Sequence, residues 1–211
     1  MPQPSPDKMA LVRSTSLALL TAALVAACGG AGHTSTTGAG STRSTTPAGS
    51  TAGAFAWLHP APPPPGWSLA RLHGSAALAY PSSWRPIHSD PGTVSAAVEQ
   101  PGSDLVTQYL NATPQQGEET FQNWAAFRPD HNREEGDSHV EVLASARGLR
   151  FRDGRGSCVI DRYRTPRTTY QEIACLVGGP RGANVIVAAG LASRWSQYAP
   201  GLERAVSAFL A

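Results

Sequence analysis

The feature that most constrains the fold is a pair of segments that carry two of the three cysteines. "SCVIDRYR" (157–164) and "TYQEIACLV" (169–177) read as strands, and residues 165–168, Thr-Pro-Arg-Thr, read as the turn between them. In that hairpin Cys158 lies directly opposite Cys175, where the Cβ atoms of paired residues are about 4.5–5.5 Å apart, close to the separation a disulfide needs. The sequence therefore predicts a Cys158–Cys175 disulfide. A pair of reduced core thiols is the alternative, while the lack of a Cys-x-x-Cys spacing disfavours zinc.

The same register creates an electrostatic conflict within the hairpin. It places Asp161 opposite Glu172, and like charges that face each other across two strands destabilise a sheet. Three explanations are open: an arginine from the preceding segment (Arg150 or Arg152) lies between them, a cation does, or the register is shifted. The density of arginines nearby favours the first.

The N-terminal segment predicts export. Lys8 and Arg13 precede an apolar run, 17–27, that is shorter than the roughly 20 residues a membrane-spanning helix needs. A charged head, an apolar middle and small residues before a cleavage site are typical of a secretory signal peptide, here residues 1–27. The alternatives are an ordinary signal peptide that happens to contain a cysteine, and a buried core helix.

Residues Val25-Ala26-Ala27-Cys28 resemble the lipobox of bacterial lipoproteins. That resemblance implies that Cys28 receives a diacylglycerol and becomes the first residue of the mature chain. Two acyl chains provide a stable membrane anchor, since each buried methylene contributes about 0.8 kcal/mol. Lys8 is the only lysine, a composition typical of a GC-rich genome, and an actinobacterial source is the hypothesis that follows.

Composition divides the rest of the chain into three parts. Residues 28–54 are rich in Gly, Ser and Thr and predict a flexible tether behind the lipidated cysteine. Residues 55–66 form a proline-rich arm that favours polyproline II, as a stiff spacer, an arm lying on the domain, or a docking peptide. Residues 67–211 are long enough for a single domain.

Periodicity predicts the elements of this domain. Alternating segments predict strands, and the helical spacing of Phe121, Trp124 and Ala125 predicts a helix over 118–127 that ends before Pro129. A second helix is expected to have Pro200 in its first turn. Together they predict an α+β fold, an antiparallel sheet packed by helices in an α/β/α sandwich. Besides the hairpin, strands are expected at 67–74, 76–81, 93–99, 104–110, 139–146 and 183–191, and the apolar stripe of the last helix comprises Leu202, Ala205, Val206, Phe209 and Leu210.

Two motifs resemble the PsbP-like superfamily, which includes the extrinsic PsbP subunit of photosystem II, a Ran-binding nuclear-import factor and many actinobacterial lipoproteins. The motifs are "AYPSSWRP" (79–86), with Tyr80, Pro81 and Trp84, and Trp195 before the terminal helix. The resemblance implies a binding or accessory role and no enzymatic activity, but it does not transfer Ran or photosystem binding. Packing in an aromatic core and a turn is the structural interpretation of these residues.

Polar clusters offer weaker candidates for a site. His131, Glu134, Asp137 and His139 could hold a divalent ion, but their spacing matches no compact metal site and a solvated face is the alternative. No cofactor is expected. "GDSH" (136–139) resembles the nucleophile block of GDSL-type esterases, yet no histidine follows His139 to activate a serine.

Arginines concentrate around the hairpin. Arg162 and Arg164 are predicted to share a sheet face, where guanidinium groups suit lipid headgroups, an anionic wall polymer or an acidic partner. Pairing with the acidic segment 130–141 is the alternative. Residues 55–211 contain 14 basic and 14 acidic side chains, so a nucleic-acid surface is not expected.

The sequence thus predicts an exported lipoprotein, anchored by its lipid at the extracytoplasmic face of the cell membrane. Its expected role is non-enzymatic binding of a protein or envelope partner, and it is expected to be a monomer. The alternative function is binding of a small ligand or metal in the cell envelope.

Overall fold

The structure of the chain is a computed structural model that describes residues 53–72 and 76–211. The predicted signal peptide 1–27, Cys28 and the tether as far as residue 52 lie outside these described residues. Within the described ranges, the helices are too short or too polar to cross a membrane.

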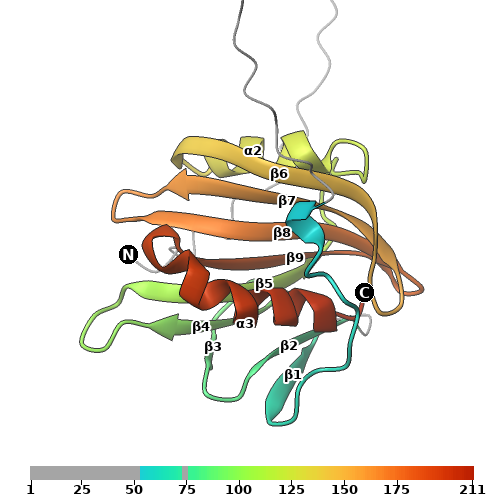
Figure 1. Ribbon diagram of the computed structural model, residues 1–211, viewed down its shortest axis with the longest axis horizontal. Helices are drawn as coiled ribbons and strands as arrows, with labels where there is room; N and C mark the ends of the chain where they lie inside the picture. The colour runs from blue at the N-terminus through green and yellow to red at the C-terminus, as the bar shows by residue number, and fades with distance from the viewer. Residues whose placement is uncertain (1–52, 73–75) are drawn as a thin grey trace, which may run out of the picture.

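A seven-stranded antiparallel sheet forms the centre of the fold, in the order β3-β4-β5-β9-β8-β7-β6 (Figure 1). Two further strands, β1 (Trp67–Arg71) and β2 (Ala77–Pro81), pair as a separate two-stranded sheet. The strands of the large sheet are β3 (Arg85–Ile87), β4 (Val94–Glu99), β5 (Val106–Pro114), β6 (Ser138–Arg150), β7 (Arg155–Arg164), β8 (Thr169–Gly179) and β9 (Gly182–Leu191).

One helix covers each face of the large sheet. Helix α3 (Trp195–Ala208) crosses the front in Figure 1 and buries an apolar stripe on Leu110, Ile173, Ile186 and their neighbours. Helix α2 (Trp124–Glu134) packs on the opposite face, where the Trp124 indole donates a hydrogen bond to the Ala174 carbonyl oxygen at 2.9 Å. These two layers around the sheet confirm the predicted α+β class and the α/β/α sandwich.

The apolar stripe of α3 is confirmed in four of its five positions. Leu202, Ala205, Val206 and Phe209 are fully buried. Leu210 is half-buried because it follows the helix and pairs with Ala77 through two backbone hydrogen bonds. The C-terminal end of the chain is thereby joined to β2.

Both helices include a proline that the sequence interpretation placed at a boundary. The prediction that α2 ends before Pro129 is wrong, because the helix begins at Trp124 and continues through Pro129 to Glu134. A proline removes one hydrogen bond from a helix interior, but Arg128 before it and Asn132 after it both bond to the same buried carboxylate, Glu172. Those contacts hold the helix on the sheet on both sides of the proline.

The start of α3 also differs from its prediction. Pro200 lies in the sixth position of the helix, not in its first turn, because α3 begins at Trp195. A short 3-10 helix, η2 (Ala192–Arg194), follows β9 directly and leads into the first turn of α3. The helix therefore starts at the end of the central strand β9, which brings Arg194 close to the ends of β4 and β5.

The hairpin of β7 and β8 has the predicted register and the predicted disulfide. Cys158 pairs with Cys175 across the two strands, with a Cα–Cα distance of 4.1 Å and a disulfide between them. Both cysteines are buried in the core beneath α3. The cross-link therefore fastens the two strands at the centre of the packed face.

The proline-rich arm lies on the domain. A 3-10 helix, η1 (Gly53–Phe55), buries Phe55 in the core, and the Ala61 N–H donates to the Ser207 carbonyl oxygen of α3 at 3.1 Å. Tyr80 and Trp84 of the "AYPSSWRP" motif are buried in that same core, as their structural interpretation predicted. Of the alternatives for the arm, the structure shows the one in which it packs along α3.

Candidate functional site

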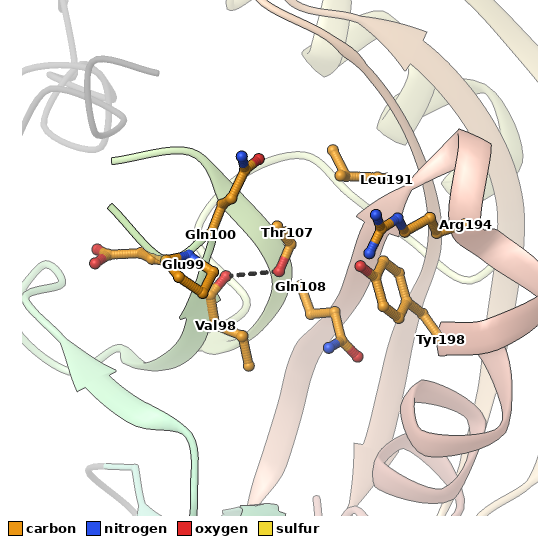
Figure 2. Close-up of a pocket in the computed structure, with 9 residues that line it drawn as sticks. Val98, Glu99, Gln100, Thr107, Gln108, Leu191, Arg194 and Tyr198 are labelled. Carbon is orange, nitrogen blue, oxygen red and sulfur yellow. Dashed lines mark hydrogen bonds between the residues drawn. The ribbon is translucent and has the colours of Figure 1, made fainter. Parts of the chain in front are cut away.

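An open cleft of about 390 Å³ lies where the ends of β4 and β5 face the start of α3 (Figure 2). Its size falls in the range of small-ligand sites, about 300–1,000 Å³. The β4–β5 side is formed by Val98, Glu99, Gln100, Pro101, Thr107 and Gln108, and the opposite side by Leu191, Arg194 and Tyr198.

The strand side of the cleft is shaped by an irregularity in the sheet. Pairing of β4 with β5 shifts register between Val98, opposite Gln108, and Glu99, opposite Val106, so Thr107 is an extra residue that bulges from β5. The Thr107 hydroxyl donates to the Val98 carbonyl oxygen at 3.1 Å and satisfies a backbone acceptor at this point (Figure 2). Gln100 and Gln108 line the cleft beside the bulge, and Figure 2 shows their side-chain amides directed away from this bond.

The helix side of the cleft depends on a glycine. A Cβ atom on Gly190 would lie 3.0 Å from Tyr198 Cδ2 and 3.4 Å from Leu202 Cδ1. Glycine at this position therefore lets the tyrosine ring pack directly onto β9. Tyr198 is buried at 8% exposure, and Figure 2 shows the Arg194 guanidinium next to its ring.

Four polar side chains at this cleft have no hydrogen-bond or ion-pair partner within the part of the chain that the structure describes. They come from both sides of the cleft, and Arg194 is the single cation among them. Glu99, by contrast, pairs with Arg85. The four are Gln100, Gln108, Arg194 and Tyr198.

A second polar cluster lies beneath α2, away from solvent. Asp161 faces Glu172 across β7 and β8, as the register predicted, and both residues have 0% exposure. Burial and the nearby charge of Glu172 raise the pKa of Asp161 to about 8. Asp161 Oδ1 is buried without a hydrogen-bond partner in the described residues. Neither carboxyl group is exposed to solvent beneath α2.

The residue that compensates the acid pair is not the one expected. Arg128 of α2 donates from Nε to Glu172 Oε1 at 2.6 Å and from its terminal nitrogen to Oε2 at 3.0 Å. The prediction that Arg150 or Arg152 fills this place is wrong: Arg150 is exposed, and Arg152 donates to the Ala208 carbonyl oxygen at 3.3 Å. The helix supplies the arginine because it crosses the sheet above this strand pair.

The weak metal candidates are not assembled into a site. No group of three or more His, Cys, Asp or Glu side chains is placed to hold a metal within residues 53–72 and 76–211. His131 instead stacks on Phe127 and lies 3.4 Å from Glu135, Glu134 ends α2, and His139 follows in β6 with a φ of 51°. Asp137 occupies the turn between the helix and that strand.

Arg162 and Arg164 lie next to the turn that closes the β7–β8 hairpin. Arg162 donates to Gln171 at 3.3 Å and lies 3.9 Å from Glu141, which belongs to the acidic segment 130–141. That ion pair is the arrangement the charge-balance alternative anticipated. Arg164 is exposed, and the role of the two arginines as a binding patch stays a prediction.

The cleft residues were missed by reasoning from the sequence. The residues at the ends of β4 and β5 lie far in the chain from Arg194 and Tyr198, and each alone is an ordinary surface or helix residue. The one available signal was the arginine directly before Trp195, where a turn runs into the last helix. Its importance depends on tertiary position, which spacing along the chain does not encode.

No protein-family description matches the sequence, and neither does any curated protein. Similar solved structures include cyanobacterial PsbP from Synechocystis sp. PCC 6803, with 12% identity, a TM-score of 0.48, and coverage of 69% of this chain and 92% of that one. A Pseudomonas aeruginosa protein of unknown function, described as a candidate regulator, has 12% identity and a TM-score of 0.45 over 69% of this chain and 96% of its own. A Bacteroides thetaiotaomicron protein has 13% identity and a TM-score of 0.39, and the match covers 69% of this chain and 48% of that one.

The cyanobacterial protein is of the kind that the Tyr80–Trp84 motif resembles. At identities of 12–13% and TM-scores below 0.5, these likenesses carry no argument about what this chain binds. Membership of the PsbP-like superfamily stays a prediction.

Proposed function

We propose that this chain is an exported, lipid-anchored protein that acts as a non-enzymatic binding or accessory protein at the cell surface. The anchor rests on the order of residues before Cys28: a charged head, an apolar run, small residues and the cysteine. The Gly, Ser and Thr composition that follows suits a tether that lets the domain reach a partner away from the bilayer.

The observation that carries the binding role is the open cleft, whose four polar side chains lack partners among the residues that the structure describes. In a folded domain, side-chain donors and acceptors gathered at one hollow are available for a ligand's polar groups. Leu191 and Val98 supply apolar surface beside them. A partner would therefore be recognised by hydrogen bonds set against a small apolar floor.

Two local arrangements support a role without catalysis. The Ser138 hydroxyl donates to the Arg164 carbonyl oxygen at 3.3 Å, so this serine is used in joining β6 to β7. The carboxyl with a raised pKa, Asp161, has 0% exposure beneath α2. Neither group is presented to a substrate in the way a nucleophile or general acid requires.

One experiment tests both the lipid anchor at Cys28 and the cleft as a binding surface. A photo-crosslinking amino acid would replace Gln108 in the cleft, and in a matched control would replace Glu134, which is exposed at the end of α2 on the opposite face. Each would be made with native Cys28 and with Cys28→Ala, and irradiated in intact cells. We expect the native chain to fractionate with membranes and to give a discrete crosslinked species from position 108.

The controls test the lipid anchor and the binding surface separately. The Cys28→Ala chain should leave the membrane fraction, and its unchanged membrane association would refute the lipid anchor. Equal crosslinking from positions 108 and 134, or none from 108, would refute the cleft as the binding surface. A crosslinked species of small mass would favour the alternative function, binding of a small envelope ligand, for which the volume of the cleft is suitable.

A further inference from the structure

We infer that the cleft binds a ligand that carries a carboxylate group, and that the guanidinium of Arg194 binds this carboxylate. The inference rests on the proposed binding function and names the chemistry of the ligand. Arg194 is exposed at the end of η2, and within the described residues no carboxylate or carbonyl oxygen accepts from its guanidinium. A guanidinium presents donors in a planar fork that matches the two oxygens of a carboxylate. The neighbouring Tyr198 phenol (Figure 2) can donate a further hydrogen bond to the same anion.

The charges around the cleft favour a monoanion. Among the described residues, Glu99 is the one carboxylate that lines it, and its charge is balanced by Arg85. Arg194 therefore leaves one uncompensated positive charge. A carboxylate would balance that charge, whereas a phosphate dianion would place an additional negative charge close to Glu99, which like-charge repulsion disfavours.

The other walls of the cleft suit an amide-bearing ligand. Gln100 and Gln108 each carry a carbonyl oxygen and an amide N–H₂, so each can both accept and donate. That pairing of groups matches a peptide backbone, and Val98, Pro101 and Leu191 provide apolar contacts for side chains. The chemistry shared by the candidate ligands is the carboxylate, supplied either by the end of a peptide or by a small organic acid.

The experiment uses the mature chain from residue 28 with Cys28→Ser, so that it is purified without lipid. Binding is followed by NMR titration of the Arg194 Nε–H and the Gln108 side-chain amide. The probes are N-acetyl-trialanine with a free carboxylate, the same peptide with a C-terminal amide, acetate, and inorganic phosphate. The variants are Arg194→Ala and, as a matched control, Arg204→Ala, an exposed arginine on α3 that lines a different hollow.

We expect the peptide acid to bind saturably at both reporter groups, and at least tenfold more tightly than its amide, because hydrogen bonds between a guanidinium and a carboxylate are stronger than those to a neutral amide. Arg194→Ala should abolish this preference and Arg204→Ala should keep it. Acetate that binds as tightly as the peptide would identify a small acid as the ligand source; weaker acetate binding would identify a peptide end. Either result supports the carboxylate inference.

Four results would overturn the carboxylate inference. The peptide acid and its amide could bind with equal affinity, or phosphate could bind more tightly than the peptide acid. The preference for the acid could persist in Arg194→Ala, or no probe could give a saturable shift. These results leave the proposed function separately testable. If the crosslinker at position 108 still captures a partner while the carboxylate preference is absent, the binding function holds and only the ligand chemistry is wrong.

Discussion

Asp161 and Glu172 lie directly opposite one another on β7 and β8, and neither side chain is exposed to solvent. Arg128 binds Glu172 with two hydrogen bonds, while Asn132 lies within 3.4–3.5 Å of both carboxylates. Two buried acids with one guanidinium leave an excess negative charge unless a proton is held. Helix α2 thus packs on a site where a proton on Asp161 completes the charge balance.

This arrangement predicts that the acid pair lowers stability as pH rises. The pKa of Asp161 is about 8 in the folded chain, above its usual value of 3.8. Between about pH 4 and pH 8 the folded state retains a proton that the unfolded state releases, so the free energy of unfolding falls by up to about 1.4 kcal/mol per pH unit. The loss from this group is complete above pH 8.

Asp161→Asn removes that titration while keeping a similar shape. We expect the variant to gain stability relative to the native chain progressively between pH 5 and pH 8, as measured by urea unfolding at several pH values. Asp130→Asn is the control, because Asp130 is an exposed partner of Arg133. A stability difference between Asp161→Asn and the native chain that is the same at pH 5 and pH 8 would contradict the prediction.

Arg128→Ala is expected to destabilise the chain by about 3–5 kcal/mol at pH 7, because it leaves Glu172 buried without its cation. Arg133→Ala on the same helix should cost less than about 1 kcal/mol, since both partners of its ion pair are substantially exposed. Chemical unfolding of both variants measures the comparison. Similar losses for the two would mean that the buried position of Glu172 contributes little.

The local features of the fold could be read from the sequence, and the reason is visible in the hairpin. Its register needs only a turn and two alternating strands, so the pairing of Cys158 with Cys175 follows from positions close in the chain. The origin of the compensating arginine could not be predicted in this way. Arg128 reaches Glu172 from a helix 44 residues earlier, and only the packing of α2 on the sheet brings them together.

The helix boundaries and the cleft show the same limit. Local propensity opposes proline in a helix and so predicts a stop at Pro129, yet tertiary contacts on both sides of it override that propensity. The cleft joins the β4–β5 strands to η2 and α3, which no single motif contains.

The disulfide is expected to contribute about 2–4 kcal/mol to stability, since it closes a loop of 17 residues in sequence separation. The double variant Cys158→Ala and Cys175→Ala should therefore unfold at a lower urea concentration than the native chain. Adding a reductant under unfolding conditions should lower the midpoint of the native chain and leave that of the double variant unchanged. An equal effect of reductant on both would show that the disulfide is not the source of the difference.

Gly190 and Gly201 offer a matched pair of substitutions for the cleft. Gly190→Ala would place a Cβ atom 3.0 Å from Tyr198 Cδ2, so the tyrosine must shift and the helix side of the cleft changes shape. Gly201 lies within α3, where a Cβ atom would meet nothing within 4 Å. Gly201→Ala should raise stability by about 0.5–1 kcal/mol, because alanine favours a helix interior over glycine.

We expect Gly190→Ala to displace the NMR resonances of Tyr198 and to reduce crosslinking from position 108, while Gly201→Ala preserves both. Thermal unfolding of the two variants provides the stability comparison. If Gly190→Ala keeps the Tyr198 resonances and the crosslinking of the native chain, then β9 or α3 can move to accommodate a methyl group. The close packing of Tyr198 on Gly190 would then not be what sets the geometry of the cleft.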